Sequence, residues 1–106
     1  MKEADAALRS AIGHGDIEMV KKLLEEGVGM ESHTMNAALL MASKYGQREV
    51  AEMLLEKGAS MEVQDTHGWT ALMSASAYNR GEVVKMLLRK GASTEAQDKH
   101  GATALT

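Results

Sequence analysis

The sequence predicts an all-α protein, an α-solenoid of stacked helix-turn-helix units with short β-hairpin fingers. Three observations predict it: a repeat of 31 and then 33 residues, an interior limited to small and aliphatic side chains, and a glycine after each apolar helix. The chain has 106 residues, with nine Met, no Phe and one Trp. A core of Ala, Leu and Met favours close helix packing over a sheet-rich sandwich.

The repeat is seen when three stretches, which begin at residues 17, 48 and 81, are aligned. They read IEMVKKLLEEGVGMES, REVAEMLLEKGASMEVQ and GEVVKMLLRKGASTEAQ. The shared Leu-Leu pairs and closing glycines are Leu23-Leu24 with Gly27, Leu54-Leu55 with Gly58, and Leu87-Leu88 with Gly91. Such a period indicates units that bury their apolar faces against their neighbours. We therefore expect one domain over 1–106, with repeats at about 1–32, 33–64 and 65–97 and a partial fourth repeat at 98–106.

Each unit is predicted to hold two short helices. The first helix covers about 6–14, 37–45 or 70–78, where Ala and Leu dominate and charges are few, so most of it should be buried. The recurring alanines of these helices are Ala11, Ala42 and Ala75. Residues that tolerate a positive φ end them, namely Gly15, Gly46 and Asn79. The second helix repeats apolar residues at helical spacing.

The later connections share the pattern D-x-x-G. Asp65 and Gly68 stand in DTHGWTAL, and Asp98 and Gly101 stand in DKHGATAL. Asp at the first position and Gly at the fourth are typical of a type I turn, and the Asp carboxylate can accept from backbone N–H groups two or three residues on. The flanking segments predict a brief β-hairpin finger. The connection between the first two units lacks both residues and is two residues shorter, so its finger should be stunted or irregular.

The 33-residue period, the D-x-x-G-x-T-A-L start, the EVVKMLLRKGA helix and its closing glycine together resemble the ankyrin repeat, over nearly the whole chain. The resemblance implies a non-enzymatic module that binds another protein. Where the family has T-P-L-H, this chain has Thr70-Ala71-Leu72-Met73. Loss of the Pro removes a rigid first turn. Loss of the His removes a hydrogen-bonding partner that the family uses between fingers, so somewhat lower stability is expected.

In the ankyrin family, partners bind the concave side formed by fingertips and by the exposed edges of the first helices. The resemblance implies that all three aromatic residues of this chain lie there, and Tyr and Trp are frequent interface anchors. The alternative is that the tyrosines merely cover a helix turn and that Trp69 merely packs against the next finger. The implied partner-binding residues are His14, Asn36, Lys44, Tyr45, Thr66, His67, Trp69, Ala77, Tyr78, Lys99 and His100, with Ala102 beside them.

Each turn aspartate stands two residues before a histidine, a pairing that also suggests half a metal site or half a catalytic dyad. In repeat terms His67 and His100 are fingertip residues of separate units, roughly 8–10 Å apart, whereas zinc needs nitrogens at about 2.0–2.1 Å. Neither His14 nor His33 supplies a convincing third ligand. No nucleophile recurs beside the histidines, and phosphate-binding glycine motifs are missing. We expect no metal, no cofactor and no catalytic residue.

Composition narrows the setting in which the protein acts. The chain has no cysteine and no apolar h-region at its N-terminus, and no apolar stretch approaches about 18 residues, which predicts neither disulfides, secretion nor a membrane span. The formal net charge of −3 argues against nucleic acid and anionic membranes as partners. We expect an intracellular, cytoplasmic protein whose partner is another protein.

Two further functional interpretations stay open. As alternatives to the binding module, the chain could be a regulatory ankyrin fragment of a larger enzyme, channel or effector, or a self-associating repeat scaffold. The scaffold interpretation rests on the sequence ending at GATALT, which leaves the third unit uncapped, so that two copies could meet end to end. The competing interpretation is that residues 98–106 fold back as a cover.

Overall fold

The computed structural model describes residues 2–28 and 31–103 and contains six helices within them. Their bounds are α1 Lys2–His14, α2 Ile17–Glu25, α3 Ser32–Lys44, α4 Arg48–Glu56, α5 Ala71–Ala77 and α6 Gly81–Arg89. The all-α prediction is confirmed. The β-hairpins are not, because no strand occurs in the described part of the chain. The end of the expected fourth repeat, 104–106, lies outside the described residues.

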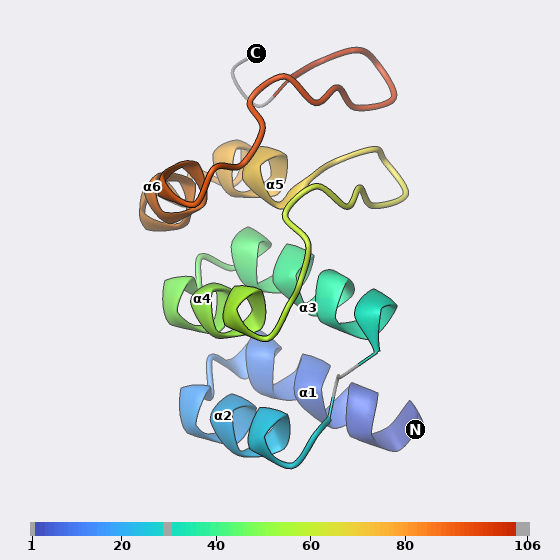
Figure 1. The fold of residues 1–106 in the computed structure, drawn as a ribbon, viewed down its shortest axis with the longest axis vertical. Coiled ribbons are helices and arrows are strands. Elements are labelled where there is room, and N and C mark those ends of the chain that lie inside the picture. The colour runs from blue at the N-terminus through green and yellow to red at the C-terminus, as the bar shows by residue number, and fades with distance from the viewer. Residues whose placement is uncertain (1, 29–30, 104–106) are drawn as a thin grey trace.

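The helices are arranged as three antiparallel pairs stacked along the long axis (Figure 1). In each pair a first helix (α1, α3 or α5) lies beside a second (α2, α4 or α6), and both rows contact the next pair. The molecule is elongated, with extents of 38 × 24 × 21 Å. This is the solenoid arrangement in which each unit contacts only its neighbours.

The core lies between these pairs and follows the predicted register. The repeat alanines Ala11, Ala42 and Ala75 are all buried, because first helices must approach closely. In α4 and α6 the first leucine of the Leu-Leu pair is fully buried, whereas in α2 the second, Leu24, is the buried one. The buried face of α2 is therefore shifted by one residue relative to its Leu-Leu pair.

Each pair is joined by a tight turn through a left-handed residue. Asn79 has φ 62° and occupies the place of Gly15 and Gly46, since Asn tolerates this conformation better than other side chains do. The next residue reaches back to the preceding pair. Arg80 Nε donates to Lys44 O at 2.9 Å, and Gln47 Nε2 donates to Ile12 O. These bonds tie the ends of neighbouring first helices together.

The first connection differs from the prediction of a stunted finger. Helix α3 begins at Ser32 rather than near residue 37, so its extra N-terminal turns take the place of a finger, while residues 29–30 lie outside the described part. The physical reason is Met35, which is only 3 % exposed and joins the main apolar core. Burial of this side chain stabilises the helical extension.

Candidate partner-binding surface

The first finger, residues 58–70, is held by one aspartate. Asp65 Oδ1 accepts from the backbone N–H groups of His67 at 2.8 Å and Trp69 at 2.9 Å. The Gly68 N–H donates to Asp65 O at 2.9 Å, which closes the predicted turn with Gly68 at φ 80°. The carboxylate thus accepts from N–H groups two and four residues along the chain, whereas the sequence predicted two or three. It fixes the fingertip and the direction of Trp69.

The second finger, residues 91–103, repeats this geometry. Asp98 Oδ1 accepts from His100 N at 2.8 Å and Ala102 N at 2.9 Å. These N–H groups, Ala102 first, together with the Trp69 indole N–H and the nearby His100 charge, hold the pKa of Asp98 below its ordinary value against the opposing effect of desolvation. Asp98 is therefore ionised over the physiological range.

The two fingers are bonded to each other as well as internally. The Lys99 N–H donates to His67 O at 3.3 Å, and Gln64 Nε2 donates to both Gly68 O and Gln97 O at 2.7 Å. The second finger approaches Gly68 so closely that a Cβ added to this residue would lie 2.8 Å from the backbone nitrogen of Lys99. The fingers form a single edge of the molecule, visible as two parallel loops in Figure 1.

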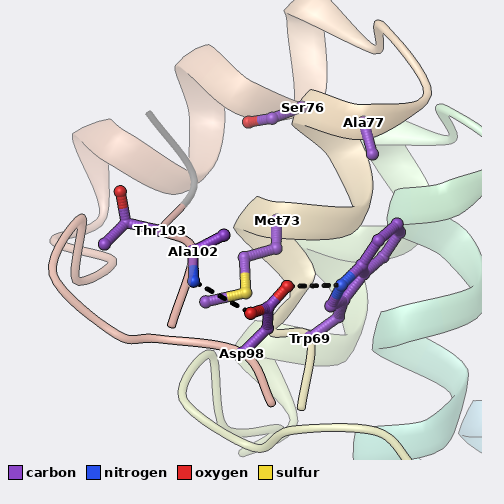
Figure 2. Close-up of a pocket in the computed structure, with 7 residues that line it drawn as sticks. All are labelled: Trp69, Met73, Ser76, Ala77, Asp98, Ala102 and Thr103. Carbon is purple, nitrogen blue, oxygen red and sulfur yellow. Dashed lines mark hydrogen bonds between the residues drawn. The ribbon is translucent and has the colours of Figure 1, made fainter. Parts of the chain in front are cut away.

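Trp69 lies at the base of the first finger and is half-buried. Its indole Nε1 donates to Asp98 Oδ2 at 3.2 Å, beneath the second finger (Figure 2). Packing against the next finger, which the sequence left as an alternative to binding, is therefore one of its roles. On this side a pocket of about 270 Å³ opens between α5 and the second finger, lined by Trp69, Met73, Ser76, Ala77, Asp98, Ala102 and Thr103.

A second pocket, of about 410 Å³, lies on the other side of Trp69. It lies between the first finger, the end of α3 and α5. Its lining residues are Lys44, Asp65, Thr66, His67, Trp69, Ser74 and Tyr78. The Trp69 and Tyr78 rings meet edge to face with centroids 6.5 Å apart, and the His67 and Trp69 rings are 6.4 Å apart. Trp69 is thus shared by both pockets.

An ammonium group sits over this aromatic cluster. Lys44 Nζ lies 5.3 Å from the Tyr78 ring centroid and 5.9 Å from that of Tyr45, within the range of cation–π attraction. Both tyrosines stay exposed, at 45 % and 44 %. They stand at the same repeat position, as C-caps of α5 and α3.

Not every residue in the predicted set belongs to this cluster. Asn36 is half-buried in α3, and its Oδ1 accepts from Ser60 N at 2.8 Å. His14 ends α1 in the first pair, where its Nδ1 bonds to Ser10 O at 2.8 Å. Lys99 and His100 are exposed on the second fingertip. The structure brings together Lys44, Tyr45, Thr66, His67, Trp69 and Tyr78. It places Ala77 with Met73 in the wall of the first pocket, the one of about 270 Å³.

Six residues that line the two pockets were not in the predicted set, namely Asp65, Met73, Ser74, Ser76, Asp98 and Thr103. Ser74 and Met73 come from the buried start of α5, and Asp98 contributes as the acceptor of the Trp69 indole. The available signal was the presence of serines in an otherwise Ala- and Leu-rich segment. Asp98 had been assigned to its turn alone, and the turn leaves its second oxygen available to Trp69.

Residues 2–28 and 31–103 carry neither a metal-binding cluster nor a membrane-spanning helix. No three histidine, cysteine or carboxylate side chains are grouped there so as to hold a metal ion. None of the helices there has the length and apolar character needed to cross a bilayer.

The stacked helix pairs, the Asp-anchored fingers and the repeat register define an α-helical repeat protein. The family model of ankyrin repeats, in three copies, matches residues 8–98, which is most of the chain. The chain belongs to the ankyrin repeat family. Ankyrin repeats are in general protein–protein interaction modules without enzymatic activity of their own. A search of curated proteins gave no match.

Proposed function

We propose that this chain is a non-enzymatic module that binds a partner protein through the surface formed by the first finger and the adjoining ends of α3 and α5. The observation that supports it most directly is the arrangement of Tyr45, Tyr78 and Trp69, the three Phe, Trp or Tyr residues of the chain. Trp69 and Tyr78 line one pocket, and the Lys44 ammonium group lies near the rings of both Tyr78 and Tyr45. Rigid aromatic anchors with partly exposed faces dominate the energy of many interfaces.

The rigidity of this surface supports the same proposal. The Arg80 bond to Lys44 O, the Asp65 turn and the Trp69–Asp98 bond fix the first finger and the ends of α3 and α5, which carry the aromatic rings. A surface that is ordered before binding loses less conformational entropy when the partner arrives. His67 and Thr66 at the fingertip extend the surface, and Lys99 and His100 continue it along the second finger.

Variant-dependent capture tests the proposal. Proteins retained by the immobilised chain are identified by mass spectrometry, and the retained partner is then titrated against the wild-type chain, Trp69→Ala and Tyr78→Ala. We expect each variant to weaken binding by more than about 1 kcal/mol, the threshold for an interface anchor. Met19→Ala, which truncates a side chain 42 % exposed on α2, serves as the control and should bind normally.

Circular dichroism melts separate loss of binding from loss of fold. Tyr78→Ala should melt close to the wild type because Tyr78 lies at the surface, 45 % exposed. Trp69→Ala should melt slightly lower because it loses its bond to Asp98. If both folded variants bind at wild-type strength, this surface is not the binding site.

A further inference from the structure

The chemistry of the pocket beside Lys44 points to the kind of segment that the partner presents. Among the side chains that the structure describes, the ion pairs are His33 with Glu31 and Arg48 with Glu52. Lys44 therefore has no carboxylate partner there, although it is held at a defined place between two aromatic rings. Its charge is oriented and unpaired at the mouth of a pocket of about 410 Å³.

The one acidic side chain that lines the same pocket is already engaged. Asp65 Oδ1 accepts two backbone N–H groups, at 2.8 and 2.9 Å, and these donors offset part of its negative charge. The other polar groups of the pocket wall, the hydroxyls of Thr66 and Ser74 and the ring of His67, can each donate a hydrogen bond. The pocket thus offers donors and one free cation, next to the apolar faces of Trp69 and Tyr78.

From this charge complementarity we infer that the partner presents an acidic segment whose Asp or Glu side chain pairs with Lys44 Nζ and whose adjacent aromatic or aliphatic side chain lies against Trp69. The inference rests on the proposed function and specifies the chemistry of the partner. A carboxylate pairs with the ammonium without displacing the tyrosines, because cation–π attraction uses their ring faces and leaves N–H donors free. An opposing Lys or Arg would instead be repelled by Lys44.

The experiment uses a phage-displayed library of random linear dodecapeptides, selected on the full chain and on three variants. Lys44→Gln removes the charge, Lys44→Arg keeps it, and Lys85→Gln makes the same charge change on the exposed face of α6. We expect the wild type, Lys44→Arg and Lys85→Gln to enrich Asp or Glu within two residues of an aromatic or aliphatic residue. Lys44→Gln should lose the acidic enrichment and keep the apolar one.

The most enriched peptide is then synthesised together with its amide counterpart, in which Asn or Gln replaces the acidic residue. Binding is followed by the emission of Trp69, the single tryptophan of the chain. The amide peptide should bind the wild type roughly three- to fivefold more weakly, the upper part of the range for a partly exposed ion pair. The two peptides should differ by less than about twofold on Lys44→Gln, and added salt should weaken only the acidic one.

The outcomes separate the inference from the proposed function. Enriched peptides without an acidic bias, or an acidic bias that survives in Lys44→Gln, overturn the inference. If such peptides still require Trp69 and Tyr78, the proposed binding surface stands without it. If the wild type retains no peptide better than the Trp69→Ala/Tyr78→Ala double variant does, both are overturned.

Discussion

The two connections between helix pairs, α2 to α3 and α4 to α5, have different structures at aligned positions. A shift of 33 residues aligns Ser32 with Asp65 and Met35 with Gly68, since Leu39 aligns with Leu72 over the same distance. In the first connection the aligned residues form the beginning of α3, which has 13 residues, whereas α5 has 7. In the second they form a finger. Figure 1 shows the start of α3 projecting to the same side as the fingers above it.

The difference shows which residues decide between helix and finger. A finger needs a carboxylate that accepts the N–H groups of the turn and a glycine that adopts φ 80°. Ser32 and Met35 offer neither, and Met35 gains more by burial in the core. The proposed binding surface is therefore asymmetric, because within residues 2–28 and 31–103 the fingers stand beside the second and third pairs.

The largest effect is expected in the first connection. Met35→Ala removes a side chain that is 3 % exposed and belongs to the main core, so the free energy of unfolding should fall by about 2–5 kcal/mol. Urea denaturation followed by circular dichroism measures it. His33→Ala, two residues earlier and exposed, should change stability by less than about 0.5 kcal/mol. Equal effects at both positions would mean that the helical extension is not held by burial.

A smaller effect is expected at the aligned residue of the finger. Gly68→Ala places a Cβ at 2.8 Å from the Lys99 backbone nitrogen in a residue with φ 80°, so it should cost about 2–3 kcal/mol, including the inter-finger bond. Gly101→Ala has nearly the same φ, 81°, but among the described residues, its two chain neighbours aside, no atom lies within 4 Å of the added Cβ. It should cost only about 1–2 kcal/mol.

Urea midpoints of these two glycine variants, measured by Trp69 emission, isolate the contact between fingers from local strain. A cost at Gly101 as large as that at Gly68 would show that the fingers tolerate separation. The bond between Lys99 N and His67 O would then contribute nothing to stability.

Much of the fold could be predicted because it depends on local patterns. The buried Ala42 and Ala75, the turn at Asp65 and the left-handed Asn79 each follow from residue type and spacing. The extension of α3 could not be predicted, since it depends on whether Met35 finds a core site in three dimensions. The absence of the turn-forming Asp and Gly from the first connection is compatible with an irregular loop as well as with a helix.

For the candidate surface, the sequence led to a prediction of which residues lie on it, but not of the contacts that their side chains make. The resemblance to the ankyrin family implied that Tyr45, Tyr78 and Trp69 lie on one side. The contact of Lys44 with Tyr78, by contrast, joins residues 34 positions apart. The separate use of Asn36, which bonds to the next connection, depends on backbone geometry that the pattern does not contain. End-to-end association of copies through the third unit stays a prediction.

The smallest effect is expected on acidification, and it should come from Asp98 in the second finger. Because the Ala102 and His100 N–H groups lower the pKa of folded Asp98, its stabilising contribution is present above the unfolded pKa of about 3.9 and is lost as pH falls through the lower folded value. At the aligned position of the first connection, Ser32 has no acidic proton to titrate.

Trp69 donates to Asp98, so the Trp69 emission should change on acidification with a midpoint below about pH 3.9. Asp98→Asn keeps an acceptor for the turn but cannot titrate, and it should lack that transition while far-UV circular dichroism stays helical. If the wild type and Asp98→Asn give the same acid titration, the carboxylate is not what couples the second finger to Trp69.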